Sequence, residues 1–180
     1  MARILVVDDE ASLRLFLEET LTNDKHEVVL AESGEKAVEL ITREVFDLAL
    51  LDLILGGING LEVLAAIREQ APETVVIMLT AHATLETAVE ALRHGAHDYL
   101  FKPCKTIQLR QSIRQGLLKR QQAQQERNLL YQLERHLADG LENIRSTMGS
   151  APIESSLAVL ETAAPLSPVG GASKIEPDRF

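Results

Sequence analysis

The sequence predicts an α/β fold in which one parallel sheet of five strands lies between two layers of helices. Short, continuously apolar runs alternate along the chain with longer segments whose apolar residues recur at helical spacing. Because the apolar runs show no polar alternation, both faces of each strand should be buried, which requires helices on both sides of the sheet. Right-handed crossovers between such strands give a three-layer, doubly wound sandwich.

The first half of the chain supplies three predicted strands and two predicted helices. Its apolar runs of four or five residues predict strands over 3–7, 28–31 and 48–51. Stripes of apolar residues at three- and four-residue spacing predict the helices between them, over 11–23 and 34–42. Ser33 is the expected N-cap of the second helix, because its hydroxyl can accept a hydrogen bond from a free backbone N–H of the first turn.

The second half repeats the same alternation. Helices are predicted over 60–70 and 84–94, and strands over 74–79 and 98–101. Pro72, Gly95 and Pro103 mark the ends of three of these elements. We expect the strand order 2-1-3-4-5, whose direction of winding reverses between the first and third strands.

Composition narrows the classes of function. The net charge of −9, with only 3% aromatic residues and no Trp, opposes direct binding of nucleic acid and excludes a base-stacking platform. The one cysteine, Cys104, excludes an internal disulfide and a cysteine zinc site. No apolar run reaches membrane-spanning length and no signal segment opens the chain, so we expect a cytoplasmic protein with no membrane association.

Charged residues follow three of the predicted strands directly. Asp8 and Asp9 follow the first, Asp52 follows the third, and Lys102 follows the fifth. The carboxyl ends of parallel strands meet at one edge of the sheet, so these four side chains should converge. Three carboxylates close together require a cation, and oxygen ligands suit Mg²⁺. The set predicts transfer of a phosphoryl group to or from a carboxylate, although Asp9 taken alone could simply cap the following helix.

Helical spacing continues far beyond residue 105. Its first part should cover the sheet through Ile107, Leu109, Ile113 and Leu117. Residues 121–128 are polar all round, and a second apolar stripe follows at Leu130, Leu133, Leu137, Leu141, Ile144 and Met148. Pairing with a second copy as a coiled coil would bury that stripe, and the alternative is a helix folded back on its own domain. Residues 149–180, rich in Pro, Gly, Ser and Ala, are expected to form a flexible linker or tail.

Four motifs in order carry a resemblance to a known family. VVDDE, LLDLILGGINGLE, MLTA and DYLFKP are similar to the receiver domain of bacterial two-component response regulators, a chemotaxis-regulator-like, flavodoxin-like domain. The resemblance covers about residues 1–118, so the expected organisation is a receiver at 1–118, an extended helix at 119–148 and a linker at 149–180. It implies a phosphorylation switch driven by a sensor histidine kinase, not a turnover enzyme, that controls an output such as transcription through a part not seen here.

The resemblance also implies a role for each site residue. Asp52 would be the phosphoacceptor, with Lys102 and Thr80 contacting the phosphoryl oxygens. Asp8, Asp9, Asp52 and the backbone carbonyl of Ile54 would bind Mg²⁺. Thr80 and Tyr99 would form the switch, Tyr99 turning inward as Thr80 moves, and Lys102-Pro103 would be a cis peptide bond.

Departures from the family pattern and two other functions have to be weighed. Gly56 stands where a proline is common, Cys104 stands where an aromatic is common, and Ile54 cannot orient an attacking water through its side chain. A phosphohydrolase of the haloacid-dehalogenase type would also use a strand-end aspartate and Mg²⁺, but it needs a second acid at the position of Ile54. A dimerisation scaffold that takes no phosphate would not need the complete acidic set.

Overall fold

Five parallel strands form one sheet in the predicted order, β2-β1-β3-β4-β5. The structure is a computed structural model that describes residues 1–82 and 84–148, so the predicted linker at 149–180 lies outside the described residues. The pairing of β1 with both β2 and β3 puts the reversal of winding between β1 and β3. The strands are β1 (Arg3–Val7), β2 (Glu27–Ala31), β3 (Leu48–Leu51), β4 (Val75–Thr80) and β5 (Asp98–Phe101).

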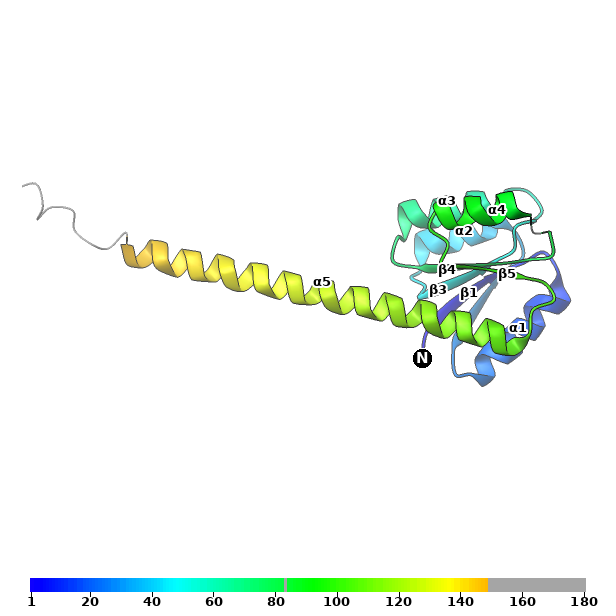
Figure 1. The fold of residues 1–180 in the computed structure, drawn as a ribbon, viewed down its shortest axis with the longest axis horizontal. Coiled ribbons are helices and arrows are strands. Elements are labelled where there is room, and N and C mark those ends of the chain that lie inside the picture. The colour runs from blue at the N-terminus through cyan, green and yellow to red at the C-terminus, as the bar shows by residue number, and fades with distance from the viewer. Residues whose placement is uncertain (83, 149–180) are drawn as a thin grey trace, which may run out of the picture. The chain divides into compact units, whose positions relative to one another are not determined.

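Helices cover both faces of the sheet, as the apolar strands require (Figure 1). α2 (Gly34–Arg43), α3 (Gly60–Gln70) and α4 (Leu85–Arg93) lie on one face, and α1 (Ala11–Asn23) lies on the other with the start of α5 (Thr106–Met148). Alternate residues of β1 feed the two apolar clusters: Leu5 and Val7 pack in one, Ile4 and Val6 in the other. The sheet is therefore buried on both sides, and only its edges remain for polar chemistry.

Local capping fixes where three of the helices begin. Ser33 caps α2 as predicted, since its hydroxyl accepts a hydrogen bond of 3.2 Å from the backbone N–H of Lys36. Asn59 and Glu62 cap α3 reciprocally, and Thr84 and Thr87 do the same for α4. Two of these caps close the loops that leave β3 and β4, so they help to set the edge of the sheet where the charged residues gather.

Several bounds differ from the prediction by one residue: β2 begins one residue earlier, α2 ends one residue later, and α4 is one residue shorter at each end. β4 runs one residue later than predicted, because Thr74 is held in the preceding turn by a hydrogen bond from its hydroxyl to the carbonyl of Phe46. Ile107 does not cover the sheet: its side chain is 72% exposed. The inward stripe of α5 runs through Leu109 and Ile113 at helical spacing, and a residue two positions before Leu109 points to the opposite side of the helix.

Charged contacts tie α5 to the rest of the domain beyond its apolar part. Arg120 donates from Nε to the carbonyl oxygen of Glu73 at 3.0 Å and pairs through Nη1 with Asp47 at 2.6 Å. Arg127 pairs with the carboxylate of Glu73. We call these four residues the α5 clamp. The polar segment 121–128 gave no sign of it, because the partners lie far away in the sequence.

The chain divides into two units, Met1–Leu130 and a second that begins at Tyr131. In the second unit the described residues continue α5 as far as Met148. The predicted apolar stripe is exposed there: Leu133, Leu137, Leu141 and Ile144 are each at least half exposed. Nothing among the described residues buries this stripe, which leaves it available to another surface.

Candidate functional site

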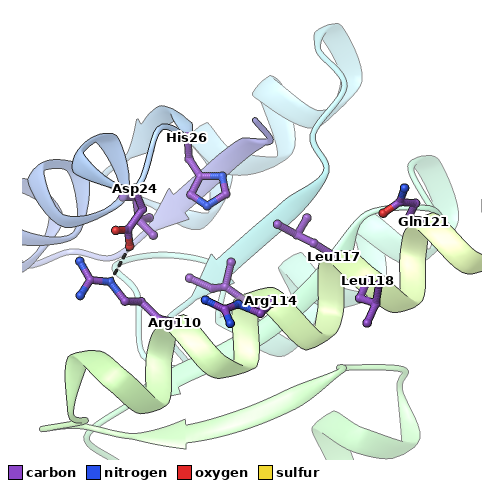
Figure 2. Close-up of a pocket in the computed structure, with 9 residues that line it drawn as sticks. Asp24, His26, Arg110, Arg114, Leu117, Leu118 and Gln121 are labelled. Atoms are coloured by element: carbon purple, nitrogen blue, oxygen red, sulfur yellow. Dashed lines mark hydrogen bonds and ion pairs between the residues drawn. The ribbon is translucent and has the colours of Figure 1, made fainter.

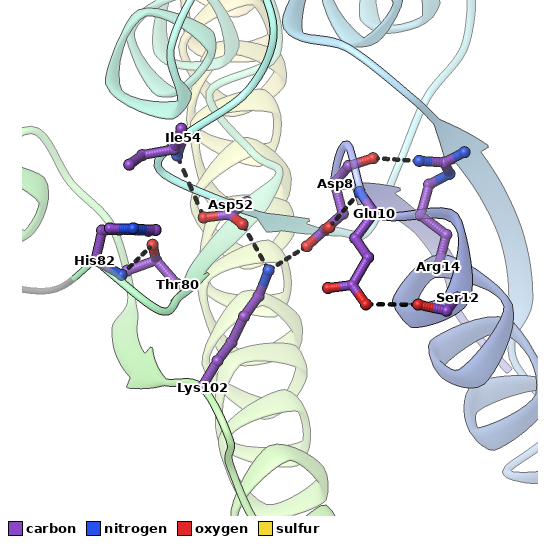
Figure 3. A network of polar contacts seen from close by, with 9 residues as sticks. All are labelled: Asp8, Glu10, Ser12, Arg14, Asp52, Ile54, Thr80, His82 and Lys102. Atoms are coloured by element: carbon purple, nitrogen blue, oxygen red, sulfur yellow. Dashed lines mark hydrogen bonds and ion pairs between the residues drawn. The ribbon is translucent and has the colours of Figure 1, made fainter.

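The three strand ends bring a lysine between two buried carboxylates, as predicted (Figure 3). Nζ of Lys102, after β5, lies 2.5 Å from Oδ2 of Asp8, after β1, and 2.5 Å from Oδ2 of Asp52, after β3. Asp8 is 2% exposed and Asp52 is 7% exposed. Charges this deeply buried need partners, and each carboxylate finds one in the same ammonium group.

The ionisation of this cluster follows from burial and pairing together. Burial raises the pKa of Asp8, and the hydrogen bonds from Lys102 and from the backbone N–H of Glu10 offset part of that rise. Burial alone would lower the pKa of Lys102, but the hydrogen bonds and charges of Asp52 and Asp8 outweigh it and leave the pKa raised. Lys102 therefore stays cationic, which suits it to contact an anionic group held at Asp52.

Asp9 completes a set of three carboxylates that fits a hard divalent cation. One oxygen each from Asp8, Asp9 and Asp52 lies within 4.8 Å of the others. Asp9 is exposed, and α1 has Glu10 at its N-cap position with no side-chain capping hydrogen bond. The alternative role of Asp9 as the helix cap is therefore wrong, and its carboxylate is free for a ligand. Oxygen donors with an open, water-accessible side match what Mg²⁺ prefers.

The backbone around Asp52 is held tightly from both sides. The Asp52 N–H donates to the carbonyl of Val7 at 2.9 Å, and its Oδ1 accepts from the backbone N–H of Ile54 at 3.2 Å. Gly60 passes so close that a Cβ there would lie 2.0 Å from the Asp52 carbonyl oxygen. No residue pattern marks Gly60 as a site residue, because its role depends on a close approach between two backbone segments.

The two residues expected to form a switch are both buried. Thr80 ends β4 with a fully buried side chain whose hydroxyl accepts from the backbone N–H of His82 at 3.1 Å, on the same side of the cluster as Asp52 (Figure 3). Tyr99 is also buried, with its hydroxyl 3.1 Å from Oγ1 of Thr87 on α4. Tyr99 thus already lies inward in this structure. The predicted cis peptide bond at Lys102-Pro103 is present.

Besides Gly60, sequence reasoning missed a second neighbour of the site. Arg14, on α1, donates from Nη1 to the backbone carbonyl of Asp8 at 2.7 Å (Figure 3). The apolar stripe of α1 does not predict this contact, because an arginine outside the stripe is expected to face solvent.

A separate cavity of about 460 Å³ lies at the other edge of the sheet, between the end of α1 and α5 (Figure 2). The ion pair of Asp24 with Arg110, 2.6 Å long, lies at this cavity, and His26 and Leu117 line it. It holds none of the predicted site residues, so it is not the place of the carboxylate chemistry. No helix in residues 1–82 and 84–148 is long and apolar enough to span a membrane.

Comparison with known proteins gives a consistent result. Residues 4–114 match the model of the response regulator receiver domain. The chain is 42% identical over 161 residues to the alginate biosynthesis transcriptional regulatory protein AlgB of Pseudomonas aeruginosa, covering 89% of this chain and 34% of AlgB. It is 39% identical over 114 residues to the regulatory protein LuxO of Vibrio cholerae, covering 63% of this chain and 25% of LuxO.

Solved structures agree with the sequence matches. A CheY-like response regulator receiver domain from Methanospirillum hungatei superposes with a TM-score of 0.67 at 31% identity, covering 68% of this chain and 98% of that one. The two transcriptional regulators are much longer than this chain, which spans about a third of the length of AlgB and a quarter of the length of LuxO.

Proposed function

The chain belongs to the response regulator receiver domain family, and from that premise we propose that Asp52 accepts a phosphoryl group from a histidine kinase. The single observation that carries the assignment is the buried Asp52 carboxylate paired with Lys102 and set beside Asp8 and Asp9. Asp9 is exposed, whereas Asp8 and Asp52 are both buried and both paired with Lys102. Of these two buried carboxylates, Asp52 is the one that follows β3, the central strand of the sheet.

The proposed step is a nucleophilic displacement at phosphorus. An oxygen of Asp52 forms a bond to phosphorus while the bond from phosphorus to the donor imidazole nitrogen breaks, and that nitrogen keeps the electron pair. Lys102 already touches the Asp52 carboxylate and can donate to an oxygen of the transferred group. The Thr80 hydroxyl can turn from the His82 N–H to donate to another.

Mg²⁺ is the proposed cofactor, held by Asp8, Asp9, Asp52 and the backbone carbonyl of Ile54. When bound, it would neutralise charge on the phosphoryl oxygens. The support from this chain is the close grouping of three carboxylate oxygens with one exposed member. The single positive charge of Lys102 is shared between Asp8 and Asp52, and Asp9 has no ion pair among the described residues, so a divalent cation would balance the remaining negative charge.

The wider organisation is also a proposal. We take residues 1–118 as the receiver, 119–148 as a helical connector and 149–180 as a linker, in a cytoplasmic protein whose output is transcription through another domain or partner. The similarity to longer transcriptional regulators supports that output. The exposed stripe on α5 supports a homodimer. The haloacid-dehalogenase alternative loses its support, because Ile54 replaces the acid that such an enzyme needs.

The test is phosphorylation by a small donor. Incubation of the full chain with acetyl phosphate and Mg²⁺ should add one phosphoryl group by intact mass, and Asp52→Asn should add none. Asp98→Asn is the matched control, since Asp98 lies in β5 and is not part of the carboxylate cluster, and it should be labelled like the wild type. Labelling that survives in Asp52→Asn would refute the assignment.

A further inference from the structure

The turn between β1 and α1 carries two of the three carboxylates, but it holds them very differently. Asp8 is fixed at both oxygens: Oδ1 accepts from the backbone N–H of Glu10 at 2.9 Å, and Oδ2 pairs with Lys102. The exposed side chain of Asp9 makes no hydrogen bond with any described residue. No hydrogen bond to a described residue restrains the Asp9 carboxylate, so its backbone is what sets the starting point and direction of the side chain.

Arg14 fixes that backbone from outside the turn. Its Nη1 donates to the carbonyl oxygen of Asp8 at 2.7 Å, and this carbonyl belongs to the peptide unit that joins Asp8 to Asp9 (Figure 3). A peptide unit is planar, so holding its oxygen also holds the nitrogen and Cα of the next residue. The bond from Arg14 thus restrains the point from which the Asp9 side chain starts.

Helix stability does not explain an arginine at this position. Arg14 is in the first turn of α1, where the helix dipole favours negative charge and disfavours a guanidinium. The acid nearest to the start of α1 is Glu10 at the N-cap, whose carboxylate accepts from the Ser12 hydroxyl and, among the described residues, forms no ion pair with Arg14. The favourable contact that Arg14 makes at this position is its hydrogen bond to the carbonyl oxygen of Asp8.

We infer that Arg14 is a positioning residue for the Mg²⁺ site: it holds the Asp8–Asp9 peptide plane so that the Asp9 carboxylate points to the shared oxygen cluster. The inference rests on the proposed function, since it assumes that the cluster binds Mg²⁺. Outer partners that orient metal ligands commonly contribute to affinity even though they never touch the metal.

Charge and positioning make opposite predictions, which makes the inference testable. A guanidinium close to the cluster repels a divalent cation, so removing the charge alone would tighten Mg²⁺ binding. Removing the restraint on Asp9 would weaken it. The sign of the change in affinity for a neutral replacement therefore separates the two roles.

The experiment is calorimetric titration of the full chain with MgCl₂, with thermal unfolding followed by circular dichroism as a check on folding. Arg14→Met should weaken Mg²⁺ binding roughly tenfold, the low end for outer partners of metal ligands. Arg14→Lys, which keeps a cationic donor of similar reach, should recover most of the affinity. Arg43→Met removes the same charge from an exposed site on α2 and should leave the affinity unchanged.

The outcomes are distinct. Equal or tighter binding by Arg14→Met, in a folded protein, would overturn the inference while leaving the proposed function intact. Absence of Mg²⁺ binding by the wild type would instead overturn the proposed function. If Arg14→Met does not fold, the shorter, neutral Arg14→Gln takes its place, with the same expected loss and the same contradicting result.

Discussion

Two backbone carbonyl oxygens at the site have neighbours from outside the charged cluster: Arg14 donates to that of Asp8, and Gly60 lies against that of Asp52. Asp8, Asp52 and Lys102 were predictable because each directly follows an apolar run, and parallel strands bring their carboxyl ends together. Arg14 and Gly60 were not, because both act on carbonyl oxygens of Asp8 and Asp52 that every residue type possesses. A sequence pattern can show where a carboxylate will lie, but it does not show which residues contact the backbone of that carboxylate's residue.

Gly60 gives the first prediction at the scale of single residues. A Cβ at this position would lie 2.0 Å from the Asp52 carbonyl oxygen and 3.0 Å from Cα of Leu53, and both are backbone atoms that cannot swing away. Gly60→Ala should lower the free energy of unfolding by about 1–3 kcal/mol, as overpacking does, and slow phosphorylation of Asp52 by acetyl phosphate. Urea denaturation and intact mass measure the two effects.

The control lies in the same loop. A Cβ at Gly56 would meet no atom within 4 Å, so Gly56→Ala should change the free energy of unfolding by no more than about 0.5 kcal/mol. Equal urea midpoints for the two variants would contradict the steric argument.

At the scale of elements, the sequence predicted the sheet, its order and the helices because apolar runs and stripes dictate them. It failed where an element's surroundings matter. Helical spacing alone left Ile107 and Leu109 as equal candidates for burial, and contact with the sheet selects Leu109. The α5 clamp could not be predicted either, because the partners of Arg120 and Arg127 are far away in the sequence.

The α5 clamp should depend on salt and pH. Arg127 holds the pKa of Glu73 below its usual value of 4.5. The stability that this pair contributes is therefore present above that value and is lost as pH falls through the lowered pKa. In hydrogen exchange at pH 7, raising the salt from 0.05 to 1 M should lower the protection of amides 119–127 in the wild type. Glu73→Gln should show the lower protection at both salt concentrations.

The size of this effect should be modest, because an exposed ion pair gains little Coulomb energy in water and loses side-chain entropy when it forms. Glu69→Gln is the matched control, since Glu69 is an exposed acid on α3 that makes no hydrogen bond or ion pair with the described residues of α5, and it should behave like the wild type. A wild type whose amides 119–127 ignore salt would show that the clamp contributes nothing to holding this part of α5.

For the whole molecule, the exposed stripe on α5 predicts self-association. A buried leucine is worth roughly 1.5–3 kcal/mol, and association costs an estimated 4–15 kcal/mol, so several leucines from each copy give a dimer of moderate affinity. We expect sedimentation of the full chain to show a dimer at micromolar concentration. Leu133→Asp with Leu137→Asp should make it a monomer, because the carboxylates would face each other across the interface.

The matched control puts the same charges elsewhere on the helix. Asn128→Asp with Gln132→Asp adds two carboxylates off the stripe and should leave the dimer intact. A full chain that sediments as a monomer at high concentration, before and after treatment with acetyl phosphate, would rule out this role for α5.

β3 joins two features that have been described separately. Asp52, the proposed phosphoacceptor, directly follows this strand, and Asp47, which pairs with Arg120 of α5, directly precedes it. Four buried residues separate them, so the two are five residue steps apart, roughly 16–17 Å of extended chain at about 3.3 Å per residue. β3 is packed on both faces, with Ala49 and Leu51 in one apolar cluster and Leu48 and Leu50 in the other. It should therefore move only as a short rigid unit. A displacement of Asp52 along β3 would therefore reach α5 at Arg120 through the ion pair with Asp47, without passing through the surface loops of the domain.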